Sequence, residues 1–300
     1  MRSGYYAGID IGTNAARLVI KNTYVNERHE IEDYDVQEIR IPLRLGVDVF
    51  KTGAIGIKKE EQLVKTMACF KNLMEIYDVI DYRAMATSAM REAKNGQDII
   101  WRIRKETGVD VQIISGNEEA NTIARIAKDF SLDEGRWVFI DVGGGSTEVS
   151  LLSKGKPTES NSFELGTLRI LAGKDRPETW KGFKKKLADY RDKYGNLEIV
   201  GTGGNINRYW KMSQHKEKKG LNVLYVEDLR ELYGKLKQYS VGERMEKFKL
   251  KPDRADVIIP AGDIFLTAAE TMGAKFIVVP MTGLGDGIVD ELVRDNMNVI

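Results

Sequence analysis

An internal repeat constrains the fold of this chain more than any other feature. The segment YAGIDIGTNAARLVI at positions 6–20 resembles WVFIDVGGGSTEVSL at positions 137–151. Asp10 matches Asp141, which lies 131 residues later in the chain. Each copy is typical of a strand that ends in Asp-x-Gly, a tight turn of small polar residues, and a second strand. The repeat therefore predicts two related halves of about 130 residues, each built around a strand–turn–strand unit.

A second, weaker correspondence supports the duplication. MATSAM at positions 85–90 resembles VGTGGN at positions 200–205, because both place small residues directly after a short apolar strand. Strand and helix patterns alternate along the chain, which predicts an α/β protein. Two similar lobes are expected to face one another across a cleft lined by both sets of turns. They are predicted to comprise residues 1–121 plus 286–300, and residues 122–285.

The spacing of apolar residues gives the individual elements. Strands are expected at Tyr6–Ile11, Arg17–Lys21, Ala84–Ala86, Val111–Ile114, Trp137–Val142, Thr147–Leu152, Ile199–Gly201 and Phe276–Val279. Helices are expected at Lys58–Tyr77, Gln97–Thr107, Glu118–Phe130, Trp180–Tyr194, Val226–Lys237 and Gly287–Asn296. The segment His215–Gly220 is expected to be a mobile loop.

The composition excludes several kinds of site. One Cys and two His among 300 residues leave no ligands for an internal disulfide or a Cys/His zinc site. His29 and His215 lie in polar segments and are expected to be solvated. A net charge of +1 predicts no bulk attraction to nucleic acid or to an anionic membrane. No apolar run approaches the ~20 residues that span a bilayer, and no signal-peptide pattern opens the chain, so a cytoplasmic location is expected.

The turn of the second copy has the composition of a phosphate-binding loop. Its glycines let a ligand approach the backbone closely, so that N–H groups can bind phosphate oxygens. A glycine-rich hairpin is the alternative, but the flanking carboxylates and the matching turn in the first half favour phosphate. The candidate phosphate-binding residues are Gly143, Gly144, Gly145, Ser146 and Thr147, and the carboxylates that could hold Mg²⁺ are Asp141 and Glu148.

The first-half turn is a weaker signal alone, because Asp-x-Gly-Thr-Asn also forms ordinary hairpins. Its pairing with the second copy makes Asp10 a further candidate near a metal ion, and makes Thr13 and Asn14 candidates for phosphate. Ser88 and Arg91 offer a hydroxyl and a guanidinium to phosphate. An N-capped helix with a surface Arg explains these two residues equally well.

Two further segments carry both a structural and a functional interpretation. Gly203 and Gly204 repeat the logic of close backbone approach, with a helix cap or turn as the alternative. Ser115-x-x-Glu118 matches a capping box, and acidic residues are favoured in a first helical turn. Position alone therefore makes neither Glu118 nor Glu119 catalytic.

Several sequence blocks, in order along nearly the whole chain, resemble those of one family. The most specific are ATSAMREAKN (86–95), ISGNEEA (114–120) and IDVGGGSTEVSLL (140–152), accompanied by IDIGTNAARLVI (9–20), LRLG (43–46), ELGTLRI (164–170), GTGGN (201–205) and RADVIIPAG (254–262). Duplicated Asp-x-Gly turns are similar to those of the actin/Hsp70/sugar-kinase (ASKHA) superfamily of ribonuclease H-like folds. The combination more specifically resembles the exopolyphosphatase/guanosine pentaphosphate phosphatase (Ppx/GppA) family.

This resemblance implies a fold and a chemistry. It implies two actin-like lobes with an interlobe cleft, and hydrolysis of a terminal phosphoanhydride bond that depends on Mg²⁺, with Mn²⁺ as an alternative ion. Glu119 stands where the family has its catalytic base, which orients and deprotonates the attacking water. Asp141 and Glu148 match the family's metal-binding carboxylates. The glycine turn and its counterpart in the first lobe match the phosphate-binding segments.

The chain also departs from the family pattern. Ala15 replaces a usual Ser, and Gly283-Leu284-Gly285-Asp286-Gly287 replaces a usual Gly-Leu-Arg-Glu-Gly, so that an Arg is missing. Longer relatives continue into a helical His-Asp domain that helps to bind extended polyphosphate. The chain is therefore expected to be a short form, for which processive action on long polymers is in doubt.

Three functions follow from the resemblance. The leading one is an exopolyphosphatase that releases orthophosphate from the ends of inorganic polyphosphate. Its closest rival removes the 5′ γ-phosphate of guanosine pentaphosphate (pppGpp), and a third is a regulator that binds ppGpp or polyphosphate with little turnover. A sugar kinase of the same superfamily fits the sequence blocks less well. A homodimer is expected from the resemblance alone.

Overall fold

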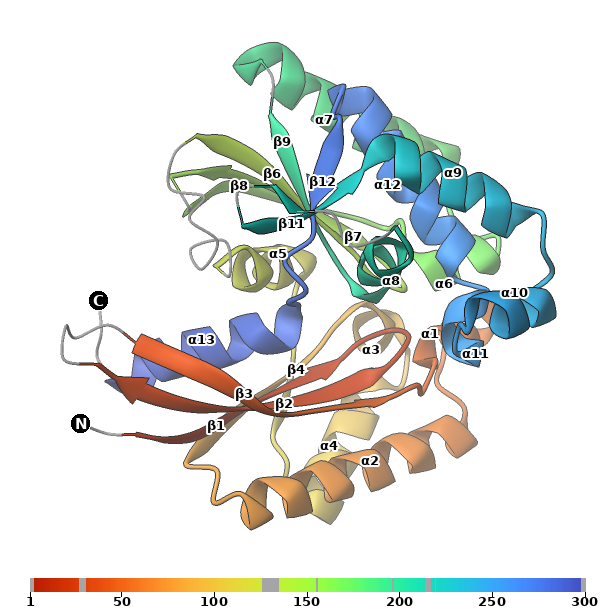
Figure 1. Cartoon of the computed structure of the whole chain (residues 1–300). Coiled ribbons are helices and arrows are strands. Elements are labelled where there is room, and N and C mark those ends of the chain that lie inside the picture. The colour runs from red at the N-terminus through yellow and green to blue at the C-terminus, as the bar shows by residue number, and fades with distance from the viewer. Residues whose placement is uncertain are drawn as a thin grey trace. The chain divides into compact units, whose positions relative to one another are not determined.

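A computed structural model gives the fold (Figure 1) and describes residues 3–26, 31–125, 135–154, 156–195, 197–213, 217–218 and 220–297. The chain divides into two compact units. Unit 1 comprises Met1–Ile126 and Gly283–Ile300, and unit 2 comprises Ala127–Thr282. In the structure the boundaries between the units therefore follow residues 126 and 282. The boundaries predicted from the sequence follow residues 121 and 285. The first difference arises because one whole helix, 116–124, packs against the C-terminal helix of unit 1.

Unit 1 begins with three strands and continues with alternating helices and strands. Its strands are β1 (Gly4–Ile11), β2 (Ala16–Val25), β3 (Ile31–Ile41), β4 (Asp81–Ala86) and β5 (Val111–Ile113). Its helices are α1 (Leu45–Thr52), α2 (Ile57–Ile76), α3 (Ser88–Glu92), α4 (Gly96–Thr107), α5 (Gly116–Ala124) and α13 (Leu284–Met297).

The sheet of unit 1 has the strand order β3-β2-β1-β4-β5. β1 pairs antiparallel with β2, whereas β4 runs parallel to both β1 and β5. The carboxyl ends of β1, β4 and β5 therefore meet at one edge of the sheet, which is where α/β proteins place their ligands. The turn after β1, the start of α3 and the start of α5 all lie at this edge.

Helices cover both faces of this sheet, with α2 and α4 on one side and α13 on the other (Figure 1). Strand β2 alternates accordingly. Leu18 and Ile20 are fully buried on one face. Val19 belongs to the opposite face, where it forms a buried cluster with Tyr6 and with Val289 of α13. This packing fixes α13 on the strands that flank the first turn.

Unit 2 has the same kind of organisation with additional helices. Its strands are β6 (Arg136–Val142), β7 (Thr147–Ser153), β8 (Lys156–Phe163), β9 (Glu198–Thr202), β10 (Glu217–Lys218), β11 (Leu221–Tyr225) and β12 (Phe276–Val278). Its helices are α6 (Thr167–Leu171), α7 (Pro177–Tyr194), α8 (Gly204–Met212), α9 (Val226–Lys237), α10 (Val241–Phe248), α11 (Pro252–Ala255) and α12 (Ile258–Met272).

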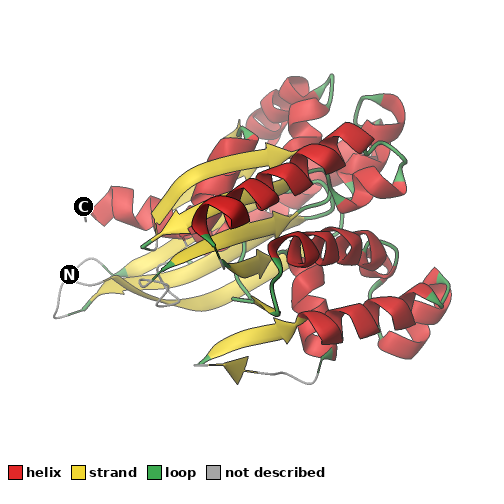
Figure 2. Ribbon diagram, turned by 90° about the horizontal axis from the view of Figure 1, so that it is seen from above, coloured by secondary structure: helices red, strands yellow, loops and turns green. Residues whose placement is uncertain are grey.

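The sheet of unit 2 has the order β10-β11-β12-β9-β6-β7-β8, and β9 runs parallel to its neighbours β6 and β12. Helices pack against the strands, as the red and yellow ribbons of Figure 2 show. Phe183 and Leu187 of α7 and Phe265 of α12 are fully buried in its core. These helices hold the β6–β7 hairpin in place.

The two units confirm the duplication predicted from the repeat. The order β3-β2-β1-β4-β5 in unit 1 corresponds to β8-β7-β6-β9-β12 in unit 2. The N–H of Gly12 donates to the carbonyl of Ala15 at 3.0 Å, and the N–H of Gly143 donates to the carbonyl of Ser146 at the same distance. The repeat therefore extends to the hydrogen bond that closes each turn.

The correspondence between positions 85–90 and 200–205 is confirmed, because a helix begins shortly after a strand in both segments, but the alignment of the two helix starts differs from that of the letters by one residue. In unit 1, α3 begins at Ser88, and in unit 2, α8 begins at Gly204, a separation of 116 residues, whereas the letters match at 115. The residues before these helices differ in conformation. Gly203 caps α8 at φ 103°, in a region closed to most side chains, whereas Thr87 caps α3 at φ −111°.

Other predicted elements differ in detail. The predicted loop His215–Gly220 contains strand β10, whose Glu217 pairs with Asn222 of β11. The helix predicted at 118–130 begins two residues earlier, at Gly116, and α5 ends at Ala124. The remainder of that prediction from residue 126 onward, together with His29 and His215, lies outside the described residues. Over the described ranges, no helix combines the length and the apolar character that crossing a bilayer requires.

Candidate functional site

Three consecutive carbonyl groups of the β6–β7 turn accept hydrogen bonds from one short segment after β8. The pairs are Gly143 O with Thr167 N–H (3.1 Å), Gly144 O with Leu168 N–H (2.8 Å) and Gly145 O with Arg169 Nε–H (2.7 Å). In a trans peptide the N–H points away from the C=O of the same unit. The amides that follow these carbonyls are therefore directed away from segment 167–169.

The amide groups of this turn are available for a ligand. In the described parts of the chain, the N–H groups of Gly144 and Gly145 have no hydrogen-bond partner. Successive backbone N–H groups directed to one side form the concavity that binds anions in many proteins. The sequence prediction of a phosphate-binding turn at 143–147 is therefore compatible with the geometry.

Gly166 explains why the segment after β8 can approach the turn so closely. A Cβ atom at this position would lie 2.4 Å from the carbonyl carbon of Gly145 and 2.5 Å from that of Gly144. Both atoms belong to backbone, so they cannot turn aside as a flexible side chain would. Only glycine fits here without displacing the turn.

Asp141 and Glu148 lie directly opposite one another in the antiparallel β6–β7 pair. Opposed residues of this kind have Cβ atoms about 4.5–5.5 Å apart. Each carboxylate also accepts a hydroxyl hydrogen bond. Thr202 Oγ1 donates to Asp141 at 2.5 Å, and Ser162 Oγ donates to Glu148 at 2.8 Å. Glu148 is almost fully buried, so the pair presents two fixed carboxylates next to the turn.

This pair fits a Mg²⁺ site of the kind that is completed by water and substrate. Mg²⁺ prefers hard oxygen ligands and commonly takes only one or two carboxylates together with phosphate oxygens. In the described ranges, no group of three or more His, Cys, Asp or Glu side chains gathers in a way that could hold a metal ion. Asp10 lies on β1 opposite Arg17, and its proposed place near the ion stays a prediction.

The start of α8 supplies a second close approach in unit 2. A Cβ atom on Gly203 would lie 2.8 Å from the carbonyl oxygen of Val142, at the end of β6. Gly204 lies against Arg254, because a Cβ atom there would lie 2.1 Å from a guanidinium nitrogen. The guanidinium of Arg254 therefore lies beside the β9–α8 junction. Arg254 was not singled out from the sequence, although it is the first residue of the block RADVIIPAG.

The first-half turn is held in the same way by the segment that follows β3. The N–H of Gly46 donates to Thr13 O at 3.0 Å, and the N–H of Arg44 donates to Asn14 O at 2.9 Å. Thr13 also accepts, through Oγ1, a hydrogen bond of 3.2 Å from the N–H of Ala89 at the start of α3. The LRLG block at 43–46 therefore supports the turn.

Glu119, the predicted base, lies beside Arg91 within unit 1. The Nη1 atom of Arg91 is 3.8 Å from Glu119 Oε2 and donates a hydrogen bond of 2.6 Å to the carbonyl of Ile114. Glu119 is 6% exposed. Ser88, which lies in the same short helix α3 as Arg91, donates through its hydroxyl to Glu92 at 2.8 Å. Unit 1 thus brings together Thr13, Ser88, Arg91 and Glu119 at the edge where its parallel strands end.

The capping box predicted at the start of α5 is confirmed. The N–H of Glu118 donates to Ser115 Oγ at 3.2 Å, and the N–H of Ser115 donates to Glu118 Oε2 at 2.7 Å. Because Glu118 accepts hydrogen bonds from the backbone and side chain of Ser115, the pKa of its carboxyl is lowered. Glu118 is exposed and occupied by the cap, whereas Glu119 is buried. The two neighbouring glutamates therefore have different environments.

Arg17 is a further candidate that the sequence analysis missed. It lies opposite Asp10 in the β1–β2 pair and is only partly exposed. Over the described residues its side chain makes no hydrogen bond and no ion pair. The guanidinium is therefore available to an anion near the first turn, and its place inside the block IDIGTNAARLVI was the signal that could have indicated it.

The missing Arg near the C-terminus has a structural basis. At Gly285, a Cβ atom would lie 2.7 Å from the Val19 side chain, so α13 packs too closely on β2 for a long side chain there. Asp286 accepts a hydrogen bond of 2.8 Å from the N–H of Gly283 and lies 3.2 Å from Lys21 Nζ. The start of α13 is therefore anchored by this hydrogen bond and by an ion pair.

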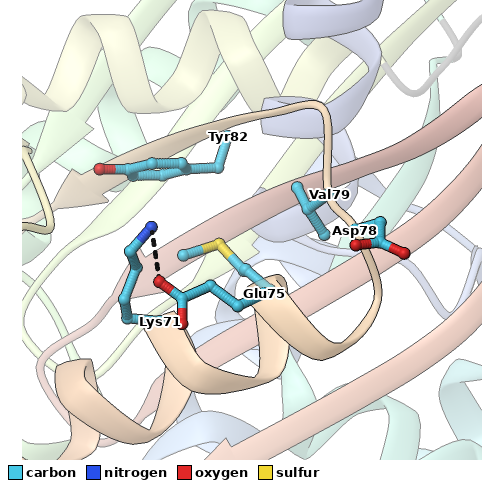
Figure 3. Close-up of a pocket in the computed structure, with 6 residues that line it drawn as sticks. Lys71, Glu75, Asp78, Val79 and Tyr82 are labelled. Atoms are coloured by element: carbon cyan, nitrogen blue, oxygen red, sulfur yellow. Dashed lines mark ion pairs between the residues drawn. The ribbon is translucent and has the colours of Figure 1, made fainter.

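Two surface pockets of unit 1 do not contain the candidate residues. One, of about 380 Å³, lies between the end of α2 and the start of β4 (Figure 3). Its Lys71 and Glu75 form an ion pair of 3.2 Å. The other, of about 370 Å³, is lined in part by Glu118 and Ile114. Neither includes a predicted phosphate-binding residue or Glu119.

Comparisons with known proteins identify the family of the chain. The chain is 30% identical to exopolyphosphatase 1 of Mycobacterium leprae over 163 residues. This match covers 54% of this chain and 47% of that protein. It is 23% identical to the guanosine-5′-triphosphate,3′-diphosphate pyrophosphatase of Aliivibrio fischeri, over 98% of this chain and 61% of that protein. The chain thus spans less than two thirds of the length of these curated relatives.

Solved structures show the same fold over the whole chain. The Ppx/GppA family member from Aquifex aeolicus is 26% identical, with a TM-score of 0.76, and the match covers 98% of this chain and 99% of that one. The two units are therefore the two lobes of an actin-like fold, as predicted. The model of the Ppx/GppA phosphatase family matches residues 25–296, and the chain belongs to that family.

Proposed function

We propose that this protein is an exopolyphosphatase, which hydrolyses the terminal phosphoanhydride bond of inorganic polyphosphate and releases orthophosphate. The observation that carries the proposal is the β6–β7 hairpin, where two amide groups without partners in the described chain adjoin the opposed carboxylates Asp141 and Glu148. Amide donors and a carboxylate-bound cation stabilise the charge on the oxygens of a transferred phosphoryl group. Membership of the Ppx/GppA family supports the same chemistry.

Glu119 is the proposed general base. Its carboxylate accepts a proton from water while the water oxygen attacks the terminal phosphorus. The bond from that phosphorus to the bridging oxygen then breaks, so that orthophosphate and a chain shortened by one phosphate leave. Arg91, fixed by its hydrogen bond to Ile114 O, restrains Glu119 from 3.8 Å and offers positive charge to the substrate.

Asp141 and Glu148 are the proposed ligands of Mg²⁺, with Mn²⁺ as an alternative and Asp10 as a further acidic group. When bound, the cation would neutralise charge on the phosphate oxygens as a Lewis acid. The hydroxyl groups of Thr202 and Ser162 hold the two carboxylates in place. Loss of Glu119, or loss of the two carboxylates Asp141 and Glu148, is expected to abolish turnover.

The second candidate function is removal of the terminal 5′ phosphate from pppGpp. It is supported by the relative from A. fischeri, which matches nearly the whole of this chain. The bond broken is of the same kind, and only the leaving group differs. A regulator that binds ppGpp or polyphosphate is the third candidate, and the presence of Glu119, Asp141 and Glu148 favours an enzyme over it.

Orthophosphate release tests the three candidates together. Short polyphosphate, long polyphosphate and pppGpp would be offered separately with Mg²⁺ to the wild-type protein and to the Glu119→Gln variant. The proposal predicts release from polyphosphate that is lost in the variant. Preferential release from pppGpp would favour the second candidate, and tight binding without release would favour the regulator. Homodimer formation and a cytoplasmic location are further predictions.

A further inference from the structure

We propose that Arg169 is a positioning residue for the phosphate-binding turn of unit 2, and that its buried guanidinium adds to the affinity of the turn for phosphate. The inference rests on the proposed function, because it identifies how the same turn is prepared for its ligand. Arg169 contacts the turn rather than the reacting atoms, so it acts through the backbone amides.

The contacts of Arg169 fix the turn from two positions. Its backbone N–H lies 3.2 Å from the carbonyl of Gly144, and its Nε–H donates to the carbonyl of Gly145 at 2.7 Å. The residue is 5% exposed, so these bonds lie in a protein environment from which water is largely excluded. A short charge-assisted hydrogen bond in such surroundings is stronger than one between neutral groups.

The support for Arg169 comes from the core of unit 2. The neighbouring Leu168 is 2% exposed, and helix α6 packs against α12. Gly166 allows this helix to lie in contact with the Gly144–Gly145 peptide, where no Cβ atom fits. Because α6 packs in the core of unit 2, the guanidinium of Arg169 is held in place. Its hydrogen bond to Gly145 O therefore restrains the orientation of the turn.

The direction of the hydrogen bond explains how Arg169 would act on a ligand. The carbonyl of Gly145 and the N–H of Ser146 belong to one peptide group and point in opposite directions. A donor on the carbonyl side therefore fixes and polarises the N–H on the other side. The positive charge of the guanidinium also lies behind the turn, where it attracts an anion bound to the amides.

In the described part of unit 1, the equivalent turn accepts hydrogen bonds from backbone groups. There, the carbonyls of Thr13 and Asn14 accept hydrogen bonds from the backbone N–H groups of Gly46 and Arg44. Over the described residues, the turn of unit 2 therefore accepts a hydrogen bond from a charged side chain, that of Arg169, whereas the turn of unit 1 accepts hydrogen bonds from backbone amides. This difference favours a role in binding, because over the described residues the same turn in unit 1 is supported by backbone N–H groups.

Orthophosphate binding measured by titration calorimetry tests the inference. The variants are Arg169→Met, which removes the donor and the charge, and Arg169→Lys, which keeps the charge and loses the Nε geometry. Arg244→Met is the matched control, because Arg244 also donates to two backbone carbonyls of unit 2, those of Leu236 and Ala255. We expect orthophosphate affinity to fall about tenfold or more in Arg169→Met, less in Arg169→Lys, and to stay unchanged in the control.

Kinetics with short polyphosphate separate positioning from simple destabilisation. The loss should appear mainly in KM, with a smaller change in kcat, and cooperative thermal unfolding should be retained. Wild-type affinity for orthophosphate in Arg169→Met would overturn the inference, as would an equal loss in Arg244→Met. If Arg169→Met does not fold, Arg169→Lys decides, and wild-type affinity in that variant would overturn the geometric role.

The same experiment distinguishes failure of the inference from failure of the proposed function. A wild-type protein that hydrolyses no substrate, but whose orthophosphate binding depends on Arg169, would contradict the enzyme and support the inference. Hydrolysis and binding that are both independent of Arg169 would support the enzyme and overturn the inference. A wild-type protein that neither hydrolyses polyphosphate nor binds orthophosphate would contradict both.

Discussion

The Nη1 atom of Arg91 lies 3.8 Å from the Oε2 atom of Glu119, while the same nitrogen donates a hydrogen bond to the carbonyl of Ile114. The distance to Glu119 exceeds that of a hydrogen bond, so the guanidinium attracts the carboxylate without occupying it. Arg91 itself is fixed by Ile114, the residue that directly follows β5. We propose that this buried carboxylate orients a water molecule and accepts its proton.

Replacing Glu119 by Gln should remove the proposed base. We expect kcat for phosphate release to fall at least about 100-fold, because positioned acid–base groups contribute about 10²–10⁴-fold to catalysis. Glu118→Gln is the matched control, since Glu118 is the preceding residue and serves the helix cap. Equal turnover in wild type and Glu119→Gln, measured with a coupled phosphate assay, would remove Glu119 from the role of base.

Asp141→Asn and Glu148→Gln should shift the dependence of activity on Mg²⁺ to higher concentrations. Each substitution removes a negative charge from the opposed pair on β6 and β7. Asp189→Asn, on the exposed side of α7, should leave the Mg²⁺ titration unchanged. If both site variants retain the wild-type titration midpoint, these carboxylates do not bind the cation.

Gly166→Ala should disturb the β6–β7 turn, which we propose binds phosphate. The added Cβ would meet backbone atoms at 2.4–2.5 Å, so the turn or α6 must move, at a cost of about 1–3 kcal/mol. Gly182→Ala in α7 is the control, because its Cβ would meet only Phe163 at 3.9 Å. Thermal melting and orthophosphate titration should reveal a loss of both stability and affinity in the first variant alone.

The cap of α5 should make stability depend on pH in the acid range. The pKa of Glu118 is lowered by its hydrogen bonds from Ser115, so its contribution is present above the unfolded-state value of about 4.3 and is lost as the pH falls through the folded-state value. Ser115→Ala should cost about 1 kcal/mol at neutral pH. Melting curves of wild type and Glu118→Gln should converge in acid, and a constant difference would contradict the cap's contribution.

Lys21 should stabilise the packing of α13 on β2. Burial alone would lower its pKa, but Asp286, Asp33 and Asp35 outweigh burial and raise it. Lys21→Met should therefore cost about 2 kcal/mol by leaving these carboxylates without their shared cation.

The matched control for this substitution is Lys71→Met, which breaks an exposed ion pair and should cost under about 1 kcal/mol. Because a raised pKa keeps Lys21 charged below the unfolded-state value of about 10.4, the difference should be constant from about pH 6 to about pH 9. Equal melting temperatures for the two variants would contradict the role of Lys21.

Local features of the fold were predictable from the sequence. The Asp-x-Gly turns and the Ser115–Glu118 cap depend on residues within a few positions of one another, so the sequence pattern contains all the information needed. The duplication was predictable because both copies keep the same turn. The residues around Glu119 were found through the family blocks, since periodicity alone gave only a helix start.

Features that depend on distant contacts were missed. Helix α12 is apolar on nearly every side and contains Pro260 and Gly262, so it shows no helical period. Strand β3 is exposed and rich in charge, which concealed an edge strand. Arg169 and Gly166 act on a turn about twenty residues earlier, and no local rule connects a buried guanidinium with the carbonyl of Gly145.

The most direct measurement is hydrolysis of short polyphosphate in ¹⁸O-labelled water, with the released orthophosphate analysed by mass spectrometry. The account predicts Mg²⁺-dependent release in which each orthophosphate carries one ¹⁸O atom from the attacking water, and loss of this release in Glu119→Gln. Absence of labelled orthophosphate from the wild-type protein, with Mg²⁺ and substrate in excess, would contradict the account.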